Sequence, residues 1–261
     1  MNEVNRTLYI PLYGKALVSK KGIILHDPKA ERIWEKEGFP LKAKSRSKWL
    51  AYYMGMRAAV FDHWTQKMLR KYPDAAVVHI GCGLDSRCER VRGYSLWYDA
   101  DFPAVISERR KYYVESDVYH MIEADARATD WIARLPKTDR AIIVMEGISM
   151  YLDLLALVGL LIGLKEQFGE IYLLMDCYTE LGAKASRIKN PVKDVGVTRV
   201  WGLDHPRYLA EQCGISYVGE REMTPAKLID QMENPEQKFF RAMFGGKMAG
   251  KLYRLYEYKG R

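Results

Sequence analysis

The sequence predicts an α/β fold with a mostly parallel sheet, and three observations carry this prediction. From residue 77 onward, short apolar stretches rich in β-branched residues alternate with longer segments of helical periodicity. A Gly-x-Gly turn at 81–83 directly follows the first of these stretches, and the second stretch ends in acid at Asp99 and Asp101. Strands that alternate with helices are joined by right-handed crossovers, so their carboxyl ends meet at one edge of the sheet.

Residues 1–73 precede the sheet and are expected to form a helical cover. Asp27-Pro28 is a typical helix start, because the aspartate side chain can cap the first turn and proline fits its first position. A second, long helix is expected from Trp49 to Lys71, with Pro73 ending it. Arg57 lies among the apolar positions of this helix.

The remaining residues, 74–261, are expected to complete a single domain with a seven-stranded sheet and helices on both faces. The strands are expected near 77–80, 95–100, 119–122, 141–145, 171–176, 215–222 and 251–258. The helices are expected near 86–92, 103–114, 127–134, 153–168, 204–213 and 225–243. Within the last two strands, Arg221 and Glu222 are polar and residues 252–258 alternate apolar and polar residues, which suits an antiparallel edge strand.

An irregular segment, residues 179–206, follows the fifth strand. Its Gly, Pro, Lys and Arg residues give it few apolar anchors. Long irregular segments at the carboxyl end of a parallel sheet often cover a substrate. The segment is therefore expected to be a mobile lid.

The composition, 48% hydrophobic and 28% charged residues, is ordinary for a soluble globular protein. No segment reaches the roughly 18 apolar residues of a membrane helix, and no cleavable signal sequence is visible. The four cysteines form no CxxC pair, so reduced thiols, a cytoplasmic location and no metal site are expected.

The net charge of +8 is concentrated near the N-terminus. Residues 1–73 carry 15 Lys and Arg against 6 Asp and Glu. One interpretation is a solvated basic surface, and the other is contact with nucleic acid or an acidic substrate.

The glycine turn predicts a binding site for a nucleoside cofactor. Glycine lets the backbone approach a ligand closely, and Asp101, about twenty residues later, is a typical partner for ribose hydroxyls. The third glycine of the G-x-G-x-x-G pattern is replaced by Ser86. This favours S-adenosylmethionine, which has no pyrophosphate, over NAD. A purely structural turn is the alternative.

Several motifs resemble those of the leucine carboxyl methyltransferase family, in its branch of tetracenomycin-type polyketide O-methyltransferases. They are GCGLDSR at 81–87, WYDADFP at 97–103, EAD at 123–125 and MEGISMYL at 145–152, with TLYIPLYGKA at 7–16 upstream. The first and fourth are the most specific, and the similarity ends near residue 180. The resemblance implies a class I methyltransferase (Rossmann-like) fold with S-adenosylmethionine as cofactor.

The resemblance also implies roles for individual residues. Gly81 and Gly83 would approach the methionine part of the cofactor, Asp101 would hold the ribose, Asp125 the adenine amino group, Glu146 the methionine ammonium or the reaction centre, and Arg57 the cofactor carboxylate. Tyr151, in the fourth motif, is expected to act in catalysis with Glu146. Alternatives are a helix cap for Asp125, a structural acid for Glu146 and a surface charge for Arg57.

The expected function is S-adenosylmethionine-dependent O-methylation of a small molecule such as a polyketide-like metabolite. No histidine lies in an evident base position, and His205, in the irregular segment, is the one weak candidate. This absence favours a carboxylate acceptor over a hydroxyl, because a carboxylate is already ionised. The alternatives are a methyltransferase for tRNA or a protein carboxylate, and an inactive cofactor-binding module. No membrane partner is expected, and the oligomeric state stays open.

Overall fold

The structure, a computed structural model, describes residues 8–39, 41, 43–188, 200–245 and 250–261. The N-terminal elements are α1 (Tyr9–Lys20), α2 (Pro28–Glu37), the 3₁₀ helix η2 (Ala43–Arg46) and α3 (Lys48–Lys71). The expected start of α2 is confirmed, since the Asp27 carboxylate accepts a hydrogen bond of 2.9 Å from the backbone N–H of Ala30. Gly38, with a φ of 56°, ends that helix in the left-handed conformation.

The predicted seven-stranded sheet is confirmed. Its strands are β1 (Ala76–Ile80), β2 (Leu96–Asp101), β3 (Tyr119–Glu123), β4 (Arg140–Met145), β5 (Glu170–Tyr178), β6 (Ser216–Arg221) and β7 (Tyr253–Gly260). The order across the sheet is β3-β2-β1-β4-β5-β7-β6. The first five strands pair in parallel, and β7 is antiparallel to both of its neighbours.

The expected edge position is right for β6 and wrong for β7, and the expected antiparallel direction is right. β7 lies between β5 and β6, so β6 is the edge strand. The polar residues of β7 suggested solvent, but Glu257 is satisfied inside the fold. Its carboxylate accepts hydrogen bonds from Trp64 Nε1 (3.0 Å) and Arg221 Nε (2.6 Å). Local alternation cannot distinguish such paired polar groups from solvated ones.

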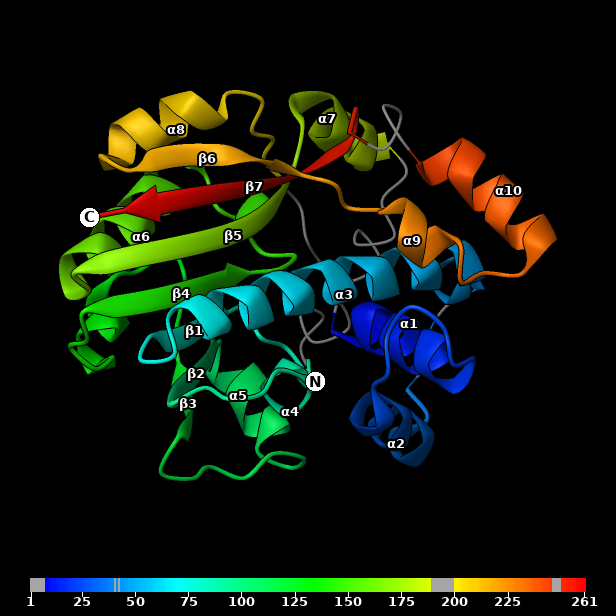
Figure 1. Cartoon of the computed structure of the whole chain (residues 1–261), viewed down its shortest axis with the longest axis horizontal. Coiled ribbons are helices and arrows are strands. Elements are labelled where there is room, and N and C mark those ends of the chain that lie inside the picture. The colour runs from blue at the N-terminus through cyan, green and yellow to red at the C-terminus, as the bar shows by residue number, and fades with distance from the viewer. Residues whose placement is uncertain (1–7, 40, 42, 189–199, 246–249) are drawn as a thin grey trace.

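Helices cover both faces of the sheet (Figure 1). They are α4 (Arg87–Arg90), α5 (Pro103–Arg109), η3 (Asp130–Arg134), η4 (Ser149–Tyr151), α6 (Leu154–Gln167), α7 (Glu180–Ile188), α8 (Pro206–Cys213), α9 (Ala226–Ile229) and α10 (Asn234–Phe244). The helix expected over 225–243 is thus two helices. The helix expected over 127–134 is a short 3₁₀ turn.

Two apolar cores lie on opposite faces of the sheet, because alternate residues of a strand point to opposite sides. Val77 and Val144 belong to the core beneath α3, whereas Val78 and Met145 belong to the core beneath α6. Both faces are therefore buried, as expected for a sheet of parallel strands joined by helices.

A third apolar cluster joins the N-terminal helices to α9 and α10. It contains Val18 of α1, Tyr52 and Met56 of α3, Ile229 of α9 and Phe240 of α10. Figure 1 shows these helices gathered at one side of the molecule, with α3 running from them along the sheet. The helices in the connection between β6 and β7 thus pack on the N-terminal helices. The grouping of all these parts into one domain stays a prediction.

The segment expected to be a lid, 179–206, is regular at its start, where α7 occupies Glu180–Ile188. Residues 189–199 of the expected lid lie outside the described residues. Beyond them the chain returns to the sheet, where the Leu203 N–H donates to the Tyr178 carbonyl at 2.8 Å. The lid function stays a prediction. Within the described part of the chain, no helix combines the length and the apolar character needed to cross a bilayer.

Candidate functional site

The glycine turn after β1 has the conformation that its sequence predicts. Gly81 and Gly83 have φ values of 72° and 53°, in the left-handed region that favours glycine. A Cβ on Gly81 would lie 2.7 Å from Cδ1 of Ile148, so a larger residue would displace that side chain. The Gly81 N–H donates to the Ala100 carbonyl of β2 at 2.7 Å, which fixes the turn against the next strand.

Asp101 lies at the end of β2, beside this turn. Its carboxylate accepts hydrogen bonds from the backbone N–H of Gly83 (2.8 Å) and of Phe102 (2.7 Å). Burial raises the pKa of Asp101 to about 6, in spite of these two donors. Two acceptor oxygens held at the mouth of a glycine turn match the two hydroxyls of a ribose.

Asp125 lies in the loop after β3 and borders a small cavity of about 90 Å³ together with Asp101 and Phe102. Its carboxylate forms an ion pair with Arg127 (2.6 Å) and accepts a hydrogen bond from the Arg127 N–H (2.9 Å). It does not cap a helix, because η3 begins only at Asp130. Gly81 and Tyr151 border this cavity and also the larger one described next, so the two adjoin around the glycine turn.

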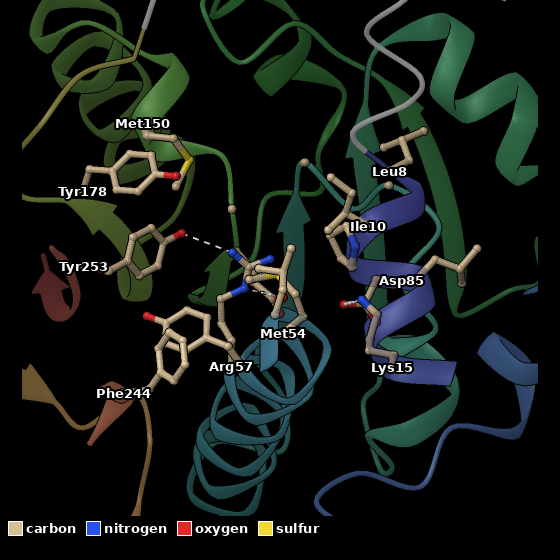
Figure 2. Close-up of a pocket in the computed structure, with 18 of the residues that line it drawn as sticks. Leu8, Ile10, Lys15, Met54, Arg57, Asp85, Met150, Tyr178, Phe244 and Tyr253 are labelled. Carbon is tan, nitrogen blue, oxygen red and sulfur yellow. Dashed lines mark hydrogen bonds and ion pairs between the residues drawn. The ribbon is translucent and has the colours of Figure 1, made fainter. Parts of the chain in front are cut away.

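A cavity of about 980 Å³ opens beyond the glycine turn. Most of its wall is apolar, contributed by α1, α3, α10 and the segment before β7. Figure 2 shows Arg57 between two groups of lining residues, with Tyr178, Tyr253 and Phe244 on one side and Ile10 and Lys15 on the other. The charged side chains of the wall, which include Arg57 and Lys15, thus form a polar band across an otherwise apolar cavity.

Glu146, directly after β4, forms part of this band and is held by two arginines. Arg57 Nε donates to its carboxylate at 3.0 Å, and Arg87 donates to the other carboxylate oxygen. Burial alone would raise the pKa of Glu146, but Arg87 and Arg57 overcome it and lower the pKa to about 2. Arg57 is buried, with 6% of its surface exposed, so it is not a surface charge.

Asp176 was not singled out from the sequence, and Asp85 and Lys15 appeared there only as members of quoted motifs. Asp176, near the end of β5, accepts hydrogen bonds from Arg57 Nη1 (3.2 Å) and from the hydroxyl of Tyr253 (2.6 Å). Lys15 of α1 forms a buried ion pair of 2.9 Å with Asp85 and lines the cavity. The signal that identified Asp101, an acid at the end of a strand, is also present at Asp176. No local pattern assigns a role to Lys15.

Among the described residues, neither histidine considered as a base is free to accept a proton from a substrate in the cavity. His79 borders it, but Nε2 of its ring lies 3.0 Å from Arg87 Nη1, which can only donate. Its Nδ1 therefore carries the hydrogen and faces Asp99 at 3.2 Å. His205 stands at the start of α8 and lines neither cavity.

The tyrosines of the cavity are also poor bases. Burial raises the pKa of the phenols of Tyr53, Tyr151, Tyr178 and Tyr253 above the ordinary value. Each therefore stays protonated at neutral pH and can donate a hydrogen bond. Tyr151, expected to act in catalysis, borders both cavities, which places it beside the glycine turn.

The sheet order, the glycine turn and the acid after β2 define a class I methyltransferase fold. The magnesium protoporphyrin IX methyltransferase of Synechocystis PCC 6803, solved with bound S-adenosylhomocysteine, has this fold. It superposes with a TM-score of 0.53 and 11% identity, covering 90% of this chain and 93% of that one.

The chain belongs to the leucine carboxyl methyltransferase family, whose model matches residues 3–163, and it is a methyltransferase. It is 29% identical over 209 residues to the tetracenomycin polyketide synthesis O-methyltransferase TcmP of Streptomyces glaucescens, covering 79% of this chain and 77% of that protein. It is 27% identical over 183 residues to the S-adenosylmethionine-dependent methyltransferase dpfgK of Gibberella zeae, covering 64% and 61%. The resemblance seen in the sequence motifs is thereby confirmed.

Proposed function

We propose that the protein methylates a carboxylate oxygen of a small, largely apolar molecule. The cofactor is S-adenosylmethionine, the cofactor named for the dpfgK relative. The observation that carries the choice of a carboxylate is the large cavity beside the glycine turn, whose described wall holds no free proton acceptor. TcmP, which acts in polyketide synthesis, supports an apolar small-molecule acceptor.

The described residues fit this cofactor. Gly81 lines both cavities with backbone alone, and Asp101 presents acceptor oxygens at the ribose position. The amino-acid end of the cofactor carries a carboxylate and an ammonium. The cavity wall offers Lys15 and Arg57 for the first group and Glu146 for the second. A wall with both signs of charge complements a zwitterion.

When bound, the cofactor supplies an electrophilic methyl group on a good leaving group. The protein must then hold the acceptor oxygen in line with that methyl group and exclude water. Tyr151 borders both cavities and keeps its phenolic proton, so it can donate a hydrogen bond to an acceptor oxygen. A carboxylate acceptor needs no base, whereas a phenol or alcohol must lose a proton.

The test supplies methyl-labelled S-adenosylmethionine with matched aromatic acceptors, one bearing a carboxylate and the other a hydroxyl on the same ring system. A methyl ester releases its label as volatile methanol in mild alkali, whereas an aryl methyl ether retains it. We expect label only in the alkali-labile fraction. At saturating cofactor, the rate should also be independent of pH above the pKa of the acceptor acid.

Alkali-stable label formed from the hydroxyl compounds, at a rate that rises with pH, would overturn the carboxylate assignment. Binding of S-adenosylhomocysteine without any transfer to an extended panel would favour an inactive cofactor-binding module. Transfer to tRNA or to a protein carboxylate, lost at high salt, would favour the macromolecular alternative.

A further inference from the structure

The connection between β6 and β7 brings α10 to the wall of the large cavity. Phe240 of α10 is fully buried against Tyr52 of α3, with ring centroids 6.4 Å apart. Phe239 packs against Trp49 with centroids 4.4 Å apart. α10 is therefore fixed to the N-terminal helices by large apolar contacts.

Charged groups fix the start of the same helix. Glu236 accepts a hydrogen bond from Lys48 at 2.8 Å and another from the hydroxyl of Tyr52. Nζ of Lys21, the residue directly after α1, lies 3.6 Å from the same carboxylate. This cluster holds the first turn of α10 against both α1 and α3, so the orientation of the helix is set by groups outside the cavity.

α10 also lines the cavity with large apolar side chains, two of which remain largely exposed. Phe239, Met243 and Phe244 all line the cavity. Phe239 is 45% exposed and Met243 is 56% exposed, and their spacing of four residues places them on one side of the helix. Large apolar groups gathered at a cavity mouth are typical of a ligand-binding surface.

The opposite wall of the cavity is also apolar, with Leu8 and Ile10 of the N-terminal segment. Figure 2 shows Phe244 across Arg57 from these residues. An occupant between the two walls would lie against apolar groups on both sides and meet the polar band of Arg57 and Glu146 at one end. A flat apolar ligand with one polar end would match this arrangement of apolar walls and polar band.

We propose that α10 is the element that selects the methyl acceptor, with Phe239 and Met243 in contact with the apolar body of the acceptor. The inference rests on the proposed function, which supplies the occupant of the cavity. Met243 adapts its shape because its side chain is unbranched and flexible. Its replacement should therefore change which ring systems fit without changing the cofactor site.

The experiment titrates fluorescent aromatic carboxylates of increasing size into protein saturated with S-adenosylhomocysteine. The probes are naphthalene-2-carboxylate, anthracene-2-carboxylate and pyrene-1-carboxylate. Wild type is compared with Met243→Ala and Phe239→Ala, and Lys238→Ala is the matched control on the same helix, since Lys238 does not line the cavity. Thermal unfolding confirms that each variant is folded.

Each alanine variant should weaken the probe that fits wild type best by about five- to tenfold, since it removes several buried carbon atoms. The preference should also move toward a larger ring system. The control should match wild type, and all four proteins should bind S-adenosylhomocysteine equally. Unchanged ring preference in both variants would overturn the proposal, as would the absence of any probe binding to wild type. The labelled-transfer assay tests the proposed function separately, because it does not depend on ring preference.

Discussion

Lowering the pH should weaken cofactor binding through Asp101. Its pKa of about 6 in the free protein means that its carboxylate is largely ionised at pH 7 and largely protonated at pH 5. Ribose hydroxyls donate to the ionised form, so binding favours the carboxylate and is linked to loss of the proton. The dissociation constant of S-adenosylhomocysteine should therefore rise about tenfold from pH 7 to pH 5, or about 1.4 kcal/mol.

Calorimetric titration across this pH range measures the effect directly, and Asp101→Asn is the matched variant. Asparagine keeps one acceptor oxygen but has no charge to lose, so its affinity should be lower at pH 7 and nearly independent of pH. 5′-Methylthioadenosine keeps the ribose and should show the same pH dependence as S-adenosylhomocysteine. A flat wild-type profile, or an equal slope in the asparagine variant, would refute the role given to Asp101.

Two other predictions concern the buried ion pairs of the cavity. Glu146→Gln should lower the free energy of unfolding by about 3 kcal/mol at pH 7, near the low end for a broken buried pair, because Arg57 keeps Asp176 as a partner. Since the pKa of Glu146 is lowered to about 2, urea unfolding should show this difference in full above pH 4.5 and a shrinking difference as the pH falls toward 2. Arg57→Lys should weaken S-adenosylhomocysteine about tenfold by calorimetry but hardly affect 5′-methylthioadenosine, which lacks the carboxylate that the planar fork of arginine matches. Equal weakening of both ligands would instead indicate damage to the packing of α3.

Most of the fold could be predicted because its signals are local. A β-branched stretch followed by Gly-x-Gly identifies β1 and its turn, and Asp27-Pro28 identifies the start of α2. The position of β7 could not be predicted, because the pairing of strands is decided by contacts distant in sequence. Glu257 appears solvated in the sequence, yet Trp64 and Arg221 satisfy it within the fold.

The candidate site likewise has a part that local sequence signals predict and a part that they do not. The sequence placed Gly81 and Asp101 correctly beside one another, because both stand at the carboxyl ends of neighbouring strands. It did not reveal that Arg57 would bridge Glu146 and Asp176, since three separate elements contribute to that contact. The contribution of α10 to the cavity was also missed, because its periodicity is equally typical of a helix that covers a sheet.

The position of β7 has a consequence for the order in which the chain can assemble. β6 leaves the ribosome before β7 but pairs only with β7 among the strands of the sheet. Until β7 inserts, the edge of β5 is open and β6 has no partner, which exposes backbone groups that can pair with other chains. Because α9 and α10 lie between these two strands in the sequence, the acceptor side of the cavity is completed in the same late step. Nascent chains of this protein should therefore gain their substrate pocket only when the sheet closes.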